Sequence, residues 1–550
     1  MNPSTALARV LVDELVRAGT RDAVLAPGSR SAPLALALQA ADGRGDLRLH
    51  VRVDERSAGF LALGLAKGSH RPVPVFTTSG TAVANLHPAV LEASHAGVPL
   101  IVVSADRPAE LRGTGANQTT DQVKIFGSAV RSFAEIAAPE QVPASTAAWR
   151  SGVSRLLRDA ATGPVHLNVC LRDPLVLDTQ DSQLDAALLG RPRGAPWSAV
   201  EGGLAATAVL LPLGPRTVVI AGDDAGPPAR QLAERAGWPL FAEPSSGSRT
   251  GTHPISTYRL LLGVPSLARD VERVLVYGRP TLSRPVTQLL AREDVEVVAV
   301  AAGRVTDPAH RVSRVLGAAT VAGAGDTDWL ERWRCADTAT LAAVDGVLAA
   351  QEGLPPLTVA REVSAAVPPG GLLVVGSSNP VRDLDLMAIA HPVGERRMVL
   401  ANRGLAGIDG MVSTAVGAAL GRHSSRSLAY VGDLTFLHDT NGLLIGPGEP
   451  RPDLTIVVAS DDGGSIFASL ETGGPVHAAA FERVFATPTG VDLAALCAAH
   501  AIAHRVVRDA ASLRAALAVA PTGIEVVEAV VDRGGRRALD AELVRAARER

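Results

Sequence analysis

Two acidic turns in the last quarter of the sequence carry the clearest chemical signal. The first reads Gly432-Asp433-Leu434 and directly follows a short apolar run. The second reads Ser460-Asp461-Asp462-Gly463-Gly464 and follows another apolar run. Short buried runs that end at such turns are typical of parallel strands, whose carboxyl ends meet at one edge of a sheet. We therefore expect Asp433 and Asp461, 28 residues apart, to lie close together.

Carboxylate oxygens beside glycine-opened backbone are suited to Mg²⁺, and a neighbouring helix N-terminus favours a diphosphate carried by the ion. Taken singly, each turn is also an ordinary strand-to-helix connection. The pair resembles the motif of thiamine-diphosphate enzymes, which opens with Gly-Asp and closes with two asparagines. The resemblance implies Mg²⁺, with Mn²⁺ as an alternative, bound by Asp433, Asp461 and the Gly463 carbonyl. Ser460-Asp461 replaces the two asparagines, which adds a negative charge opposite the diphosphate.

Glu55 is the candidate catalytic residue of the N-terminal part. It follows the apolar stretch around Val51 and opens a helical pattern, a position that also suits an acidic residue near a helix N-terminus. Its surroundings resemble the segment that holds the activating glutamate of thiamine-diphosphate enzymes. The resemblance implies that Glu55 hydrogen-bonds the aminopyrimidine of the cofactor and promotes proton loss from its reactive carbon.

Five further motifs narrow the resemblance to one family. They extend through both outer thirds of the chain and resemble the 2-succinyl-5-enolpyruvyl-6-hydroxy-3-cyclohexene-1-carboxylate synthases of menaquinone biosynthesis. The motifs are Pro27-Gly28-Ser29-Arg30-Ser31, Ser104-Ala105-Asp106-Arg107-Pro108, Asn117-Gln118, Ser377-Ser378-Asn379-Pro380-Val381-Arg382-Asp383 and Ala401-Asn402-Arg403-Gly404-Leu405-Ala406-Gly407-Ile408-Asp409-Gly410.

Arginine is well suited to the substrates that this family implies, 2-oxoglutarate and isochorismate, because both are dicarboxylates. Its guanidinium binds a carboxylate through two parallel hydrogen bonds and keeps its charge at neutral pH. The resemblance implies substrate contacts from Ser29, Arg30, Arg107, Gln118, Ser378, Arg382, Arg403, Ile466 and Phe467, with a weaker match at Arg284. It also implies cofactor contacts from Ile408, Gly432, Leu434, Gly464 and Ile466.

The activity implied by the family is a carboligation that begins with a decarboxylation. Carbon dioxide leaves 2-oxoglutarate on the cofactor, and the remaining succinyl carbanion adds to the ring of isochorismate. No histidine falls within the matched motifs, which fits a reaction with little acid–base apparatus. His87 and His95 are expected on helix faces as ordinary polar groups.

Composition indicates a globular enzyme with small-molecule substrates. Of the 550 residues, 47% are hydrophobic and 20% charged, and the formal net charge is −3. This balance gives no reason to expect nucleic acid or a membrane surface as partner. Cys170, Cys335 and Cys497 lack the paired spacing of a disulfide framework or zinc site, and the N-terminal residues do not read as a signal peptide. We expect a cytoplasmic protein.

The apolar pattern predicts an α/β fold with three domains. Strand-like runs alternate with helical patterns in the first and last thirds; examples are strands over 50–53, 73–77 and 372–376 and a helix over 80–93. This alternation indicates two similar parallel-sheet cofactor domains flanking a central αβ domain. The predicted boundaries are 1–185 for the pyrimidine-binding domain, 186–350 for the central domain and 351–550 for the diphosphate-binding domain. The family resemblance implies a homodimer, or a dimer of dimers, with the site between two chains.

Three alternatives remain open from the sequence. The first is another thiamine-diphosphate carboligase or decarboxylase, such as an acetohydroxyacid synthase, although a pyruvate enzyme requires fewer arginines. The second is a non-catalytic relative that only binds ligands, for which Asp461 in place of asparagine is the sole support. The third is a nicotinamide or flavin enzyme, but Gly222-Asp223-Asp224-Ala225-Gly226 lacks the glycine spacing of a dinucleotide fingerprint.

Overall fold

The computed structural model describes residues 2–140, 142–176, 188–199, 206–301 and 303–549. The chain divides into two compact units that are not contiguous in sequence. Unit 1 comprises residues 1–202, 404–423 and 437–452, and unit 2 comprises residues 203–403, 424–436 and 453–550.

Unit 1 is built on a six-stranded sheet in which every strand pairing is parallel. The strand order is β2-β1-β3-β4-β6-β5. The central strands are buried from end to end, which explains why they are continuous apolar runs in the sequence. The strands are β1 (Asp22–Leu25), β2 (Arg48–Val51), β3 (Val73–Thr77), β4 (Leu100–Asp106), β5 (Phe133–Ile136) and β6 (Val165–Cys170).

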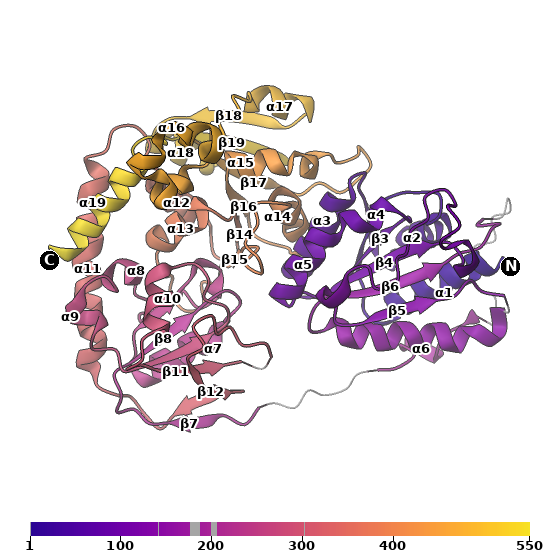
Figure 1. Cartoon of the computed structure of the whole chain (residues 1–550), viewed down its shortest axis with the longest axis horizontal. Coiled ribbons are helices and arrows are strands. Elements are labelled where there is room, and N and C mark those ends of the chain that lie inside the picture. Colours follow the sequence, from indigo (N-terminus) through magenta and orange to yellow (C-terminus); the bar gives the residue numbers. More distant parts are fainter. Residues whose placement is uncertain (1, 141, 177–187, 200–205, 302, 550) are drawn as a thin grey trace. The chain divides into compact units, whose positions relative to one another are not determined.

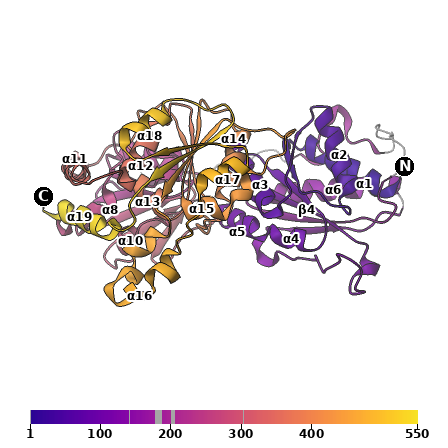
Figure 2. The same cartoon turned by 90° about the horizontal axis from the view of Figure 1, so that it is seen from above.

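Helices lie on both sides of this sheet (Figure 1 and Figure 2). Three of them, α1 (Pro3–Arg17), α2 (Ala32–Gly43) and α6 (Val142–Ala160), share one hydrophobic core with the strands. The remaining helices of unit 1 are α3 (Glu55–Ser69), α4 (Thr81–Asn85), α5 (His87–Ala96) and α14 (Met411–Gly421).

Helix α14 crosses α3 at backbone contact distance. A Cβ atom added to Gly64 of α3 would lie 2.1 Å from the Thr414 carbonyl oxygen, and one added to Gly417 of α14 would lie 2.2 Å from the Leu61 carbonyl oxygen. Only glycine therefore fits at these two positions, because a side chain would collide with backbone that cannot move aside. The crossing attaches residues 404–423 to the helix that begins with Glu55.

Unit 2 contains a five-stranded sheet of order β12-β11-β10-β8-β9 and the separate pair β13-β7, again with parallel pairings. These strands are β7 (Val209–Leu211), β8 (Thr217–Ala221), β9 (Leu240–Ala242), β10 (Arg273–Tyr277), β11 (Glu296–Val300), β12 (Val312–Leu316) and β13 (Ala319–Val321). Their helices are α7 (Pro227–Ala236), α8 (Tyr258–Leu261), α9 (Pro265–Ala268), α10 (Arg284–Leu290) and α11 (Thr327–Ala349).

The second six-stranded sheet of the protein also belongs to unit 2 and has the order β15-β14-β16-β17-β19-β18. Its strands are β14 (Leu372–Val375), β15 (Met398–Leu400), β16 (Ser427–Gly432), β17 (Leu454–Ser460), β18 (Ala503–Val507) and β19 (Ile524–Val530). Its helices are α12 (Pro356–Ala365), α13 (Asn379–Met387), α15 (Asp433–His438), α16 (Ala478–Phe481), α17 (Leu493–Ala499), α18 (Ala510–Leu517) and α19 (Arg536–Arg548).

The two six-stranded sheets have the same topology. When the strands of each are counted from its own first strand, both have the order 2-1-3-4-6-5. This confirms the predicted α/β class and the shared plan of the outer domains. The predicted boundary near residue 185 lies outside the described residues, and the division into three domains stays a prediction.

Two local predictions are wrong. The single helix expected over 80–93 is interrupted at Leu86, where α5 begins with Pro88 in its first turn, because proline has no N–H to continue the preceding helix. The strand expected over 50–53 lies two residues earlier, as β2, and Val53 is exposed. No described helix combines the length and apolarity that crossing a membrane requires.

Candidate active site

The predicted site residues lie where strands end at the carboxyl edges of the two six-stranded sheets. In unit 1, Ser29 and Arg30 follow β1, Glu55 follows β2 and Arg107 follows β4. Both sheets reverse their strand order beside the first strand, and ligands of open α/β sheets bind at such switch points. In unit 2, Ser378 and Arg382 follow β14, Arg403 follows β15, Asp433 follows β16 and Asp461 follows β17.

Asp433 and Asp461 lie together, as their position after two paired strands predicts. The carboxylate Oδ2 of Asp433 accepts hydrogen bonds from the backbone N–H groups of Asp461 and Gly463, each at 3.1 Å. Its Oδ1 accepts from the Leu434 N–H at 2.6 Å. The Gly463 backbone is thus fixed beside both aspartates, and its carbonyl belongs to the same turn.

The surroundings of these two carboxylates disfavour negative charge. Burial raises the pKa of Asp433 above its ordinary value. Burial and, to a smaller extent, the charge of Asp433 raise the pKa of Asp461 to about 7, although a hydrogen bond with Ser465 opposes the rise. A divalent cation relieves this repulsion, because it supplies positive charge between two hard oxygen donors. The donor set therefore fits Mg²⁺.

Ile466 and Phe467 follow this turn on a short 3₁₀ helix, Ser465–Ser469, and both are half-buried. The Ser465 hydroxyl also accepts a hydrogen bond of 2.8 Å from the Asn379 side chain at the start of α13. The Asp461 turn is thereby linked to the helix that carries Arg382.

Glu55 is the first residue of α3, and Asp54 caps that helix by accepting hydrogen bonds from the N–H groups of Arg56 and Ser57. Residues 437–452 hold this start in place. Asn441 donates to the Asp54 carboxylate at 2.7 Å, and Arg56 donates to the His438 carbonyl at 2.8 Å. These contacts fix the backbone on both sides of Glu55, at Asp54 and at Arg56, and so hold the start of the helix rigid. The side chain of Glu55 is half-buried.

Ile408 lies in the segment between β15 and α14, which is attached to unit 1. Two N–H groups of this segment, from Gly404 and Leu405, donate to the Glu92 carboxylate on α5 at 2.8 and 2.7 Å. A Cβ atom on Gly410 would lie 1.9 Å from the Phe60 ring, so the segment presses directly against α3. Ile408 is half-buried there.

In unit 1, Arg107 is the most enclosed of the predicted substrate residues. Its guanidinium Nη1 donates to the Ser79 hydroxyl at 2.6 Å and to the Gln118 carbonyl at 2.5 Å. Burial and the nearby charge of Arg30 lower its pKa. Arg30 itself donates to the Leu171 carbonyl at 3.1 Å, while its buried Nε has no hydrogen-bond partner among the described residues. Arg30 also pairs with Asp173 at 3.4 Å. Two neighbouring guanidinium groups have the charge and the donors that carboxylate binding requires.

A second pair of arginines lies in unit 2. Burial and the neighbouring Arg403 lower the pKa of Arg382 to about 10. Arg382 lies in the first turn of α13, where its Nη1 donates to the Ser378 carbonyl at 2.6 Å. The buried Arg403 donates from Nη2 to the Thr281 hydroxyl at 2.9 Å, and its Nε has no partner among the described residues. Arg284, in contrast, is exposed and paired with Glu471.

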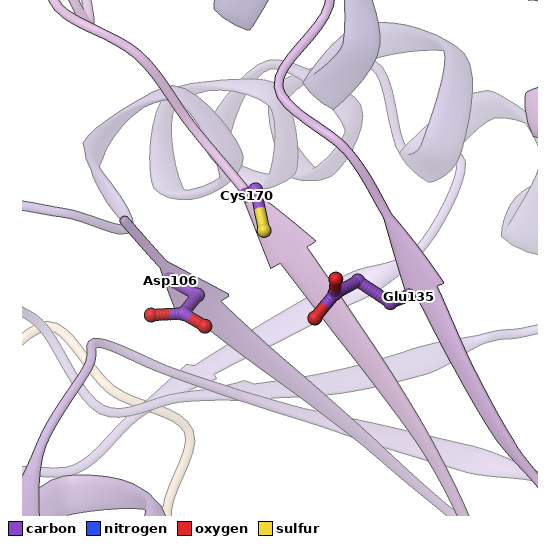
Figure 3. A group of neighbouring side chains, drawn as sticks. All are labelled: Asp106, Glu135 and Cys170. Carbon is purple, nitrogen blue, oxygen red and sulfur yellow. The ribbon is translucent and has the colours of Figure 1, made fainter. Parts of the chain in front are cut away.

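Sequence reasoning missed the polar cluster behind Arg107. Figure 3 shows Asp106, Glu135 and Cys170 pointing toward one another from β4, β5 and β6. Their ligand atoms all lie within 4.8 Å of one another, as in a metal site. However, Nη2 of Arg112 lies 3.1 Å from Asp106, 2.5 Å from Glu135 and 3.3 Å from Cys170. The guanidinium already supplies the positive charge, so this cluster anchors the loop between Arg107 and Gln118.

No sequence signal identifies Arg112, because its partners come from three different strands. Asn168 joins the same network: its side-chain amide donates to Asp106 and Glu135 at 2.9 Å, and its oxygen accepts from Gln122 at 2.9 Å. A buried asparagine within the apolar strand β6 is the one hint available beforehand, since a buried amide requires hydrogen-bond partners.

Sequence comparison with known proteins identifies the family of the chain. Residues 5–125 match the family model described as "Thiamine pyrophosphate enzyme, N-terminal TPP binding domain". The chain is 57% identical over 558 residues to the 2-succinyl-5-enolpyruvyl-6-hydroxy-3-cyclohexene-1-carboxylate synthase of Nocardioides sp., which covers 99% of this chain and 98% of the relative. The enzymes of that name from Kineococcus radiotolerans and Saccharopolyspora erythraea are 53% and 49% identical, with at least 97% of each chain covered. The chain thus belongs to the 2-succinyl-5-enolpyruvyl-6-hydroxy-3-cyclohexene-1-carboxylate synthase family of thiamine-diphosphate enzymes.

Proposed function

We propose that this protein decarboxylates 2-oxoglutarate on thiamine diphosphate and joins the remaining succinyl group to isochorismate. The products are 2-succinyl-5-enolpyruvyl-6-hydroxy-3-cyclohexene-1-carboxylate and carbon dioxide, a step of menaquinone biosynthesis. The observation that carries the proposal is the identity with enzymes of this name along nearly the whole chain. The two arginine pairs support it independently, because each substrate is a dicarboxylate.

Mg²⁺, with Mn²⁺ as an alternative, is proposed to be bound by Asp433, Asp461 and the Gly463 carbonyl. The support is the donor set itself, which consists of the buried Asp433 carboxylate, the half-buried Asp461 carboxylate and a backbone turn beside them. Gly432, Leu434, Gly464 and Ile466 line the proposed diphosphate site. When bound, the cofactor supplies a nucleophilic carbon and an electron sink for the carbanion.

Glu55 is proposed to hydrogen-bond the aminopyrimidine of the cofactor, and to give a proton to that ring and take it back during the reaction. The rigid start of α3 supports this role, because proton transfer requires a hydrogen bond of fixed geometry. Ile408 would support the cofactor from below. Ile466 and Phe467 would form an apolar wall that excludes water from the reacting carbon.

The arginines are proposed to bind the substrate carboxylates. Arg403 would hold the carboxylate of the succinyl group, and the supporting observation is that it is buried with a neutral partner, Thr281, and no ion pair among the described residues. Arg30, Arg107 and Arg382 would bind the remaining carboxylates, with Ser29, Gln118 and Ser378 as neutral partners. Arg284 is the least supported of the proposed substrate ligands, because its side chain is exposed to solvent.

We also propose that the enzyme is a homodimer and acts in the cytoplasm. The distribution of Glu55 and Asp433 between two separate sheets supports a site completed by a second chain. The three cysteines, all free thiols, are consistent with a reducing compartment.

The direct test is to incubate the purified protein with Mg²⁺, thiamine diphosphate and 2-oxoglutarate, with and without isochorismate. We expect carbon dioxide release coupled to formation of the adduct, followed by mass spectrometry. A parallel incubation with pyruvate is the control. Turnover of pyruvate with no reaction of 2-oxoglutarate would contradict the proposal and favour an acetohydroxyacid synthase.

A further inference from the structure

Helix α13 links the proposed metal-binding turn of unit 2 to one of the arginines that are proposed to bind substrate carboxylates. Its first residue, Asn379, contacts the Asp461 turn through Ser465. Its fourth residue is Arg382, one of the proposed carboxylate ligands. The position of this short helix therefore decides where Arg382 points relative to the cofactor turn.

Two consecutive residues of the five-stranded-sheet region hold α13 from outside its own sheet. Tyr258, the first residue of α8, donates its hydroxyl hydrogen to the Asp385 carboxylate, whose oxygens lie at 2.9 and 3.1 Å. The next residue, Arg259, donates to the backbone carbonyl of Arg382 at 2.8 Å. Asp385 lies three residues after Arg382, so the two contacts hold one turn of α13.

Burial gives these contacts their strength. Tyr258 is 1% exposed and Asp385 is completely buried, so water does not compete for the hydrogen bond. Burial raises the pKa of the Tyr258 hydroxyl well above its ordinary value, which keeps it a donor. Arg249 adds a hydrogen bond of 2.6 Å to the Asp385 carbonyl and lies 3.6 Å from its carboxylate. The ring of Tyr258 stacks on Phe241 of β9 at 5.2 Å, which fixes its orientation.

We propose that Tyr258 is a positioning residue for substrate binding: through Asp385 it fixes the turn of α13 that presents Arg382. The part of unit 2 around the five-stranded sheet then has a role in substrate binding, because it fixes the position of Arg382, which belongs to a helix of the second six-stranded sheet. This inference rests on the proposed role of Arg382 in binding substrate.

The test is a double-mutant cycle with Tyr258→Phe and Arg382→Ala. The phenylalanine keeps the ring and its stacking and removes only the hydroxyl. We expect Tyr258→Phe to lower kcat/KM about tenfold to a hundredfold, because small misplacements of a binding group have effects of this size. In the Arg382→Ala background the same change should lower kcat/KM less than about twofold, since residues that act through one another are not additive.

Tyr277→Phe is the matched control. Tyr277 is a buried tyrosine of β10 in the same region, and its hydroxyl makes no hydrogen bond to α13 among the described residues. Its loss should leave kcat/KM within about twofold of the wild type in both backgrounds. Thermal midpoints of all variants separate lost stability from lost positioning.

Additive effects of Tyr258→Phe and Arg382→Ala would overturn the inference, as would a lowered thermal midpoint with unchanged kcat/KM. If Tyr258→Phe does not fold, Arg259→Ala replaces it in the same cycle, with the same expected coupling. Wild-type kinetics in Arg382→Ala alone would instead overturn the proposed role of Arg382, and would do so whatever Tyr258→Phe shows.

Discussion

Arginine has two distinct roles in this protein, and the surroundings of each side chain separate them. Arg150 is completely buried and forms ion pairs with Asp13 and Glu14 at 2.7 Å each, which makes it structural. Arg403 is almost as buried, but it donates to the neutral Thr281 hydroxyl and forms no ion pair among the described residues. A buried guanidinium without an ion pair is unfavourable in the free protein, which supports the proposal that Arg403 binds an anionic ligand.

Replacing Arg403 by alanine should therefore weaken substrate binding. Loss of one partner from a buried charge pair costs about 2–5 kcal/mol, so the KM for 2-oxoglutarate should rise and kcat/KM should fall. Steady-state kinetics measures both. Arg334→Ala, which removes an exposed arginine paired with Glu331, is the control. Kinetics indistinguishable between the two variants would exclude Arg403 from the substrate site.

The two proposed metal ligands should respond differently to substitution. Asp433→Ala removes a carboxylate and should abolish retention of thiamine diphosphate and Mg²⁺, measured by isothermal titration calorimetry. Asp461→Asn keeps an oxygen donor and removes one of two repelling charges, so it should bind the cofactor and remain active. Full activity of Asp433→Ala at limiting Mg²⁺ would refute the assignment.

His166 provides a pH-dependent contribution to stability. Burial in β6 lowers its pKa to about 3, and its Nε2 lies 2.7 Å from the Ser104 hydroxyl. Because the unfolded state binds the proton more tightly, stability is lost as the pH falls below about 6.5, by about 2 kcal/mol at pH 5. The thermal midpoint should thus fall more between pH 7 and pH 5 in the wild type than in His166→Gln. Equal shifts in both proteins would contradict this explanation.

At the residue scale, the turns after short apolar runs singled out Glu55, Asp433 and Asp461, and the structure brings the Asp433 carboxylate and the Asp461 backbone together. The candidate arginines came from motifs that resemble the family, and the roles of all these residues stay predictions. Tyr258 and Arg112 could not be predicted. Their partners lie more than a hundred residues away or on several strands, and no local pattern records such pairing.

At the element scale, burial decides which strands the sequence reveals. The central strands are buried on both faces and are therefore apolar runs, so they were predicted almost to the residue. The edge strands β5, β12 and β18 and the paired strands β7 and β13 were missed, because most of their residues are partly or fully exposed and their apolar pattern is weak. Strand β9 was also missed although it is buried, because three residues are too few to form a recognisable apolar run. Most of the turns that carry the candidate site residues could be located because they follow strands that the sequence reveals, but the roles of those residues stay predictions.

The crossing of α3 and α14 should tolerate no side chain at Gly417. Gly417→Ala forces a methyl group against the Leu61 carbonyl and should destabilise the protein by about 1–3 kcal/mol. Gly152→Ala is the matched control: it lies inside α6 with nothing within 4 Å, so it should stabilise by about 0.5–1 kcal/mol. Thermal unfolding measures both effects. A change of the same sign in the two variants would refute the close crossing.

At the scale of the whole molecule, complementation between two inactive variants tests whether the proposed site is shared between two chains. Glu55→Gln and Asp433→Ala should each be inactive alone. If the site combines Glu55 of one chain with Asp433 of another, a mixed dimer has one site with both lesions and one intact site. Co-expression in equal amounts should then recover about a quarter of wild-type activity, because half of the random dimers are mixed.

Differentially tagged chains, purified over both tags in succession, isolate the mixed dimers for this measurement. Double-tagged dimers without activity would exclude a shared site. That is the result expected if each site lies within one chain, because each chain of the mixed dimer carries one of the two lesions.

Unit 1 consists of three segments that are separated in the sequence, and this separation affects how the unit folds during synthesis. The first 202 residues leave the ribosome well before residues 404–452, which supply α14 and the contacts around Glu55. At translation rates of about 5–20 residues per second, the missing segment follows about 12–50 seconds later. During that interval α14 is not yet there to pack against α3 at Leu61 and Leu65. Because incompletely packed intermediates expose hydrophobic surface, we expect the nascent chain to bind chaperones at this stage.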